Sequence, residues 1–135
     1  REMNILQKIP FNENQAVVFD IDDTLLRSDT FQVIKPTWDL FQYCKDKGYK
    51  IYIITARPDT KRVIKWTATQ LKQAGLTGFE KISFRPGWDF NVYKYKLDMR
   101  RSIPEKIVMS VGDMLWDIKP EGGFPLLVTK TTYNV

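Results

Sequence analysis

Short apolar, β-branched runs alternate with longer amphipathic stretches along the chain. The apolar runs predict strands at residues 15–21, 50–55, 81–84, 106–111 and 126–129. The amphipathic stretches predict helices at residues 36–47, 60–73 and 92–102, with a short helix from residue 114. Because strands alternate with helices, we predict a parallel sheet with right-handed crossovers, which places the chain in the α/β class.

Polar side chains lie at the carboxyl ends of three of the predicted strands. They are Asp20 and Asp22 at the end of the first, Thr55 and Arg57 at the end of the second, and Asp113, with Asp117 one helical turn later, just after the fourth. Open α/β sheets place their active sites at the carboxyl edge, and charges there are costly unless they bind a metal or take part in chemistry. Carboxylate oxygens suit Mg²⁺, whereas hydroxyl and cationic donors suit phosphate oxygens.

These groups resemble, in order, the four motifs of the haloacid dehalogenase (HAD) superfamily of phosphohydrolases. The matching residues are Asp20, Asp22 and Thr24 for the first motif, Thr55 for the second, a lysine within residues 93–96 for the third, and Gly112, Asp113 and Asp117 for the fourth. Each acid or hydroxyl taken alone could be an ordinary helix cap or strand residue. All four motifs in order, each after a suitable element, favour the HAD interpretation.

The resemblance implies a role for each of these residues. Asp20 is the nucleophile that forms an aspartyl-phosphate, and Asp22 protonates the leaving oxygen and then activates water. The implied Mg²⁺ ligands are Asp20, the backbone carbonyl of Asp22, and Asp113, with Asp117 supporting the metal directly or through water. Thr55 and Lys96 hold the phosphoryl oxygens. Lys94 remains an alternative to Lys96, which we favour because of the apolar residues that follow it.

The resemblance also implies a fold. We expect a three-layer, HAD-like Rossmannoid sandwich with strand order 5-4-1-2-3, formed by one domain over residues 1–135. Residues 24–50 and 55–96 already hold other elements and leave no room for a cap domain. We therefore expect an open site for a bulky or polymeric phosphate. Its rim would carry Arg27, Arg57, Arg85, Trp88 and Trp116, which can grip phosphates and stack on bases.

Composition narrows the class of protein. The chain has 135 residues, 43% hydrophobic and 27% charged, and its apolar runs are all shorter than the roughly 20 residues of a membrane span. It has no histidine and one cysteine, Cys44, which excludes His-based and Cys-rich zinc sites and an intrachain disulfide. We expect a cytoplasmic or other reducing intracellular compartment and no membrane partner. The net charge of +5 fits either an ordinary basic domain or an anionic substrate, including nucleic acid.

Several alternatives stay open. Residues 19–26, 56–58 and 133–134 are similar to the acid-phosphatase branch of the superfamily. The absence of a cap and the arginine-bearing loops are more like the 3′-phosphatase domain of polynucleotide kinases. The substrate is accordingly a nucleic-acid 3′-phosphate end or a small phosphomonoester, and a phosphate-binding module without turnover is a third possibility. We interpret Asp23 as a turn residue, and Trp38 and Trp66 as core residues at helical spacing.

Overall fold

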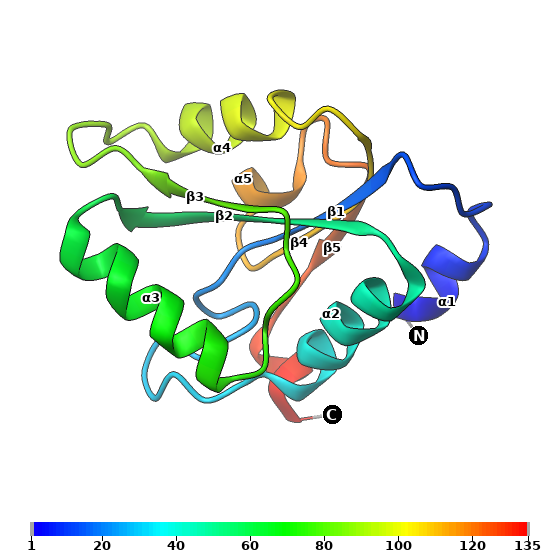
Figure 1. Cartoon of the computed structure of the whole chain (residues 1–135), viewed down its shortest axis with the longest axis horizontal. Coiled ribbons are helices and arrows are strands. Elements are labelled where there is room, and N and C mark those ends of the chain that lie inside the picture. Colours follow the sequence, from blue (N-terminus) through cyan, green and yellow to red (C-terminus); the bar gives the residue numbers. More distant parts are fainter. Residues whose placement is uncertain (1, 135) are drawn as a thin grey trace.

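The computed structural model describes residues 2–134 and contains a five-stranded parallel sheet (Figure 1). The strands are β1 (Gln15–Phe19), β2 (Lys50–Pro58), β3 (Lys81–Arg85), β4 (Lys106–Gly112) and β5 (Phe124–Leu127). Their order is β3-β2-β1-β4-β5, which is the predicted order read from the opposite edge. The predicted α/β class and sheet topology are therefore confirmed.

Helices cover both faces of this sheet. They are α1 (Glu2–Gln7), α2 (Lys35–Lys47), α3 (Lys61–Gln73), α4 (Val92–Arg101) and α5 (Leu115–Ile118), followed by the 3₁₀ helix η1 (Lys130–Asn134). Helices α2 and α3 lie on one side of the sheet, and α4 and α5 lie on the other (Figure 1). Among the helices within residues 2–134, none combines the length and the apolar character that a transmembrane segment requires.

Alternating strand residues fill the two cores. Val17 and Phe19 of β1 pack into the larger core together with residues of α2 and α3. Val18, which lies between them, packs against Ile54 and Tyr95 in a smaller core beneath α4. Because both faces of a parallel sheet are buried, the strands are apolar at nearly every position, which made them visible in the sequence.

The pairing of β1 with its two neighbours brings the carboxyl ends of three strands together. On one side, Val17 pairs with Ile51 of β2, and on the other side it pairs with Met109 of β4. The carboxyl ends of these three strands therefore meet at one edge of the sheet. In the described residues, the segment between β1 and α2 holds turns and isolated bridges, and the segment between β2 and α4 holds only α3 and β3.

Three predictions need correction. Strand β2 continues to Pro58 rather than ending at residue 55, and β5 spans residues 124–127 rather than 126–129. Strand β5 is an edge strand that pairs only with β4, and proline is tolerated on edge strands; Pro125 within the run obscured this strand. Trp38 packs against the core and donates through Nε1 to the Ala74 carbonyl at 2.7 Å, but Trp66 is 44% exposed and is not a core residue.

Candidate active site

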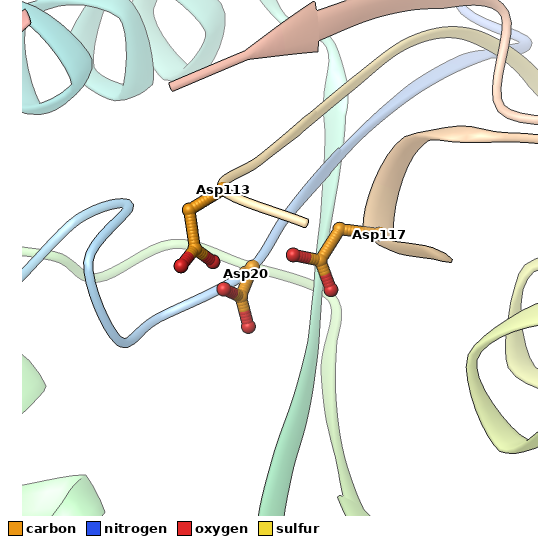
Figure 2. A group of neighbouring side chains, drawn as sticks. All are labelled: Asp20, Asp113 and Asp117. Atoms are coloured by element: carbon orange, nitrogen blue, oxygen red, sulfur yellow. The ribbon is translucent and has the colours of Figure 1, made fainter. Parts of the chain in front are cut away.

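Three carboxylates converge at the carboxyl edge of the sheet. Asp20 directly follows β1, Asp113 follows β4, and Asp117 lies in α5. One oxygen from each carboxylate lies within 4.8 Å of the others, and the side chains point toward one another in Figure 2. The backbone N–H of Asp20 donates to the Val111 carbonyl at 3.0 Å, which extends the β1–β4 ladder into the site.

Asp20 is held from both sides. It is 8% exposed, and its Oδ2 accepts a hydrogen bond from the Thr24 hydroxyl at 3.1 Å. Its Oδ1 accepts from the Lys96 ammonium at 2.9 Å. The Thr24 carbonyl in turn accepts from the hydroxyl of Thr37 in α2. The threonine of the first motif therefore fixes the orientation of Asp20 and ties the turn after β1 to the neighbouring helix.

Lys96, and not Lys94, reaches the site. Its side chain is 2% exposed, donates to the Ile54 carbonyl at 2.6 Å, and lies 2.8 Å from Asp117 Oδ1. Burial opposes the charged form, but Asp20 and Asp117 together raise the pKa of Lys96 above its ordinary value. Lys94 is 68% exposed and forms an ion pair with Asp98 one turn along α4. Residues two apart on a helix face different directions, so Lys94 points away from the site that Lys96 enters.

The carboxylate cluster lacks enough positive charge of its own. Burial, together with a hydrogen bond and repulsion from Asp20, raises the pKa of Asp113 to about 8. Burial and Asp20 likewise raise the pKa of Asp117, although Lys96 opposes this shift. Two buried carboxylates, Asp20 and Asp117, and the half-buried Asp113 lie beside one ammonium, and this set suits a divalent cation with a preference for oxygen ligands. The residues present therefore fit the predicted metal at Asp20, Asp113 and Asp117.

Gly112 is required by the close approach of α5. A Cβ atom at this position would lie 2.2 Å from the Cβ of Asp117 and 2.6 Å from its Oδ2. Asp117 Oδ2 also accepts from the backbone N–H of Met114 at 3.0 Å, which caps the short helix. The glycine of the fourth motif thus makes room for the carboxylate that follows it.

Thr55 lies in the same region. Its side chain is fully buried within β2, and its hydroxyl oxygen accepts from the backbone N–H of Arg57 at 3.1 Å. The Ile54 carbonyl, one residue earlier, accepts from Lys96. Its role as a phosphate ligand stays a prediction.

Asp22 and Arg57 form a bidentate ion pair that the sequence interpretation missed. Arg57 Nε and Nη2 donate to the two carboxylate oxygens of Asp22 at 3.0 and 2.8 Å. Arg57 is only 7% exposed, so its predicted place on the substrate rim is wrong. The guanidinium was assigned to a loop because β2 was expected to end before it, whereas it lies inside the strand.

The other predicted rim residues behave differently from one another. Arg85 is half-buried, and its guanidinium donates to the carbonyls of Ala56 at 2.9 Å and Asp89 at 2.7 Å, so it braces the loop after β3. Trp88 in that loop is 78% exposed, and Phe90, two residues further along the same loop, is 85% exposed. Arg27 forms an ion pair with Asp29, and Trp116 is half-buried. Asp23, predicted as a turn residue, has a positive φ of 57° and accepts from Ser28.

Comparisons with known proteins identify the family of the chain. The family model of the HAD superfamily, subfamily IIIB (Acid phosphatase), matches residues 27–131. This match covers most of the chain, so the chain belongs to this family. The matched segment includes Thr55, Lys96, Asp113 and Asp117 but begins after Asp20 and Asp22. The HAD resemblance is thereby confirmed.

Two solved structures share the fold. A class C acid phosphatase from Bacillus anthracis with tungstate bound has a TM-score of 0.62 and 19% identity over 87% of this chain and 59% of its own. A chain of a Pnkp1/Rnl/Hen1 complex has a TM-score of 0.60 and 17% identity over 68% of this chain and 35% of its own. The chain thus spans about three-fifths and about one-third of these two chains. No curated protein matches the sequence significantly.

Proposed function

We propose that this protein is a Mg²⁺-dependent phosphomonoester hydrolase that acts through an aspartyl-phosphate on Asp20. The observation that carries the proposal is the cluster of Asp20, Asp113 and Asp117, whose oxygens lie within 4.8 Å of one another beside the buried Lys96. A nucleophilic carboxylate and a phosphate dianion repel each other. The site therefore needs more positive charge than Lys96 supplies, and the same three carboxylates are suited to bind it.

The proposed metal site draws on carboxylates that lie close together and on one backbone carbonyl that the family resemblance implies. Asp20, Asp113 and the backbone carbonyl of Asp22 would hold Mg²⁺, with Asp117 supporting the site. When bound, Mg²⁺ supplies charge neutralisation between the nucleophile and the phosphate.

The chain's own residues would carry the two chemical steps. In the first, a carboxylate oxygen of Asp20 attacks phosphorus, the P–O ester bond breaks with its electron pair on the ester oxygen, and Asp22 gives that oxygen a proton. In the second, Asp22 takes a proton from a water molecule whose oxygen attacks phosphorus, and the electron pair of the broken bond returns to Asp20. Thr55 and Lys96 would donate hydrogen bonds to the phosphoryl oxygens.

Beryllium fluoride together with Mg²⁺ tests the proposed intermediate, because it mimics a phosphorylated carboxylate. We expect the mixture to raise the melting temperature of the wild-type protein, since a ligand that binds only the folded state stabilises it. Neither beryllium fluoride with EDTA nor an Asp20→Asn variant should show the same rise. An unchanged melting curve at saturating concentrations of the mixture would contradict the proposed site. A shifted curve without turnover of any phosphomonoester would indicate a binding module.

For the substrate, we propose a bulky or polymeric phosphate, with nucleic-acid 3′-phosphate ends as the specific candidate. The support is the short connections around the site, the exposed rings of Trp88 and Phe90, and the net charge of +5. Exposed aromatic rings can stack on bases without sequence preference. Arg57 and Arg85 no longer support this proposal, because both guanidinium groups bond to the protein itself.

The second candidate is a small phosphomonoester, which the match to an acid-phosphatase family favours. Comparing kcat/KM for a 3′-phosphorylated oligonucleotide and a mononucleotide at increasing salt separates the two. For a nucleic-acid substrate we expect a higher value for the oligonucleotide, a steep fall with salt, and a selective loss in Trp88→Ala. Equal or better hydrolysis of the mononucleotide at moderate salt would favour the small substrate.

A further inference from the structure

Arg57 and Asp22 are joined more specifically than an ordinary ion pair requires. The two residues lie on different segments, at the end of β2 and in the turn after β1, and meet through two parallel hydrogen bonds of 3.0 and 2.8 Å. A planar guanidinium that binds a carboxylate in this way fixes the plane of the carboxylate as well as its position. A lysine in the same place would supply charge without this geometry.

The guanidinium is itself fixed by α3. Its Nη1 donates to Thr67 Oγ1 at 2.9 Å and to Gln70 Oε1 at 2.6 Å. The ring of Trp66 lies 4.9 Å from its Cζ atom, and the ring of Phe31 lies 5.9 Å away. These two rings pack edge to face at 5.0 Å and cover the cation, which leaves it 7% exposed.

Arg57 has little capacity left for a substrate. Of the five N–H donors of a guanidinium, four already have acceptors in Asp22, Thr67 and Gln70. Asp22 differs, because its side chain is 37% exposed and each carboxylate oxygen keeps a second lone-pair direction beyond the one that Arg57 uses. The pair therefore presents Asp22, and not Arg57, to an incoming ester.

We propose that Arg57 is a positioning residue for the phosphatase reaction. It acts through Asp22 by fixing the carboxylate plane so that one oxygen lies along the line of proton transfer to the ester oxygen. Thr67 and Gln70 of α3 hold Arg57 for this task. The proposal rests on the proposed function, because it takes Asp22 as the proton donor to the leaving group.

The leaving group provides a readout that a purely structural brace would not change. An alkyl alkoxide needs a proton as the P–O bond breaks, whereas p-nitrophenolate leaves readily without one. We expect Arg57→Gln to lower kcat/KM for an alkyl phosphomonoester about 10²-fold, the usual contribution of a positioned proton donor. The same variant should lower kcat/KM for p-nitrophenyl phosphate only a few-fold. The kcat/KM of Arg57→Lys for the alkyl ester should lie between those of the wild type and Arg57→Gln.

A double-mutant cycle tests whether the effect passes through Asp22. In an Asp22→Asn background, Arg57→Gln should cause little further loss on the alkyl ester, because the group that Arg57 positions is already inactive. If Arg57→Gln folds poorly, Thr67→Val provides a milder test, since it removes one acceptor of the guanidinium at nearly constant volume. This variant should also lose kcat/KM mainly on the alkyl ester, but the loss should be smaller than in Arg57→Gln. Arg101→Gln, which removes an exposed cation paired with Glu121, is the charge-matched control. It should leave kcat/KM unchanged for both esters.

The outcomes separate this proposal from the function on which it rests. A wild-type protein that hydrolyses neither ester would contradict the phosphatase mechanism. A wild-type protein that hydrolyses both would establish turnover. In that case, equal losses for the two esters in the Arg57 and Thr67 variants, or additive losses in the cycle, would overturn the positioning role alone.

Discussion

Two carboxylates, two residues apart in the sequence, lie in two different halves of the site. Asp20 belongs to the half that would hold the proposed metal, here called the metal-facing half; it is formed with Lys96, Asp113 and Asp117, and in it the Asp20 side chain is 10% exposed. Asp22 belongs to an arginine half, formed with Arg57, Thr67 and Gln70, in which its side chain is 37% exposed. The same strand-end pattern thus delivers one buried acid and one accessible acid.

The two halves balance their charge differently. The metal-facing half places three carboxylates around one ammonium, so it carries excess negative charge when all are ionised. The arginine half pairs one carboxylate with one guanidinium. Only the first half therefore depends on a charge from outside the chain. This difference suits a division of labour in which the first half binds phosphate and metal and the second transfers protons.

The largest effect is expected from Asp20→Asn in the metal-facing half. The substitution keeps the shape of the side chain but removes its nucleophilic charge, so phosphatase activity should fall by several powers of ten. Circular dichroism should show an unchanged fold. Asp39→Asn, which removes an exposed acid of α2 paired with Lys35, is the matched control and should stay near wild-type activity. Near-normal activity of Asp20→Asn would show that Asp20 is not the nucleophile.

Lys96→Met should give the next largest effect. Removing the ammonium leaves Asp20 and Asp117 buried without their partner, and breaking a buried ion pair in this way typically costs about 3 kcal/mol. Chemical denaturation without metal measures this loss, and Mg²⁺ should recover more stability than in the wild type. Lys94→Met removes an exposed lysine two residues earlier and should leave activity and melting temperature nearly unchanged. Equal effects of the two substitutions would place Lys96 outside the site.

Gly112→Ala should weaken the metal-facing half without removing a ligand. The new methyl group must displace Asp117, because a Cβ would lie 2.2 Å from the Cβ of that residue. We expect about a tenfold weaker Mg²⁺ affinity and about 1–3 kcal/mol lower stability. Isothermal titration with Mg²⁺ measures the first effect. Gly87→Ala is the control, since its Cβ would meet the Asp59 carboxylate at an ordinary 3.8 Å. Unchanged Mg²⁺ affinity in Gly112→Ala would show that Asp117 does not support the metal.

The smallest effect is expected from Thr60→Ala, which removes the cap of α3. The Thr60 hydroxyl accepts from the Val63 backbone N–H at 3.2 Å, and loss of such a cap typically costs about 1 kcal/mol. Because α3 holds Arg57, any change in activity should appear with alkyl esters and not in Mg²⁺ affinity. Asn91→Ala removes the corresponding cap of α4, the helix that carries Lys96. This variant should change Mg²⁺ affinity and should not act selectively on alkyl esters. Identical profiles for the two variants would mean that the halves are not independent.

The metal-facing half was largely predictable from the sequence. Asp20 and Asp113 directly follow apolar strands, so local pattern alone placed each of them at the carboxyl end of a strand. That the two strands are neighbours does not follow from periodicity and came from the family resemblance. The choice of Lys96 over Lys94 depended on the apolar residues after it, and its burial agrees with that choice.

The arginine half was not predictable, because it depends on the packing of α3. Arg57 and Asp22 are 35 residues apart, and nothing in either segment marks the other as its partner. Trp66 has the helical spacing of a core residue, yet its ring covers Arg57 at the surface of the molecule. The spacing of apolar residues predicts which face of a helix is apolar, but not which residues that face contacts. For this reason the ion pair was missed and Trp66 was misassigned.

The pairing of β1 with β4 has a consequence for folding kinetics. Val17 meets Ile51 after a short excursion of the chain, but it meets Met109 only after roughly ninety residues, and closing longer loops costs more entropy. High contact order of this kind slows folding. We therefore expect β1 and β2 to associate before β4 inserts beside β1. Since Asp113 follows β4, regain of phosphatase activity should lag behind regain of helical signal during refolding.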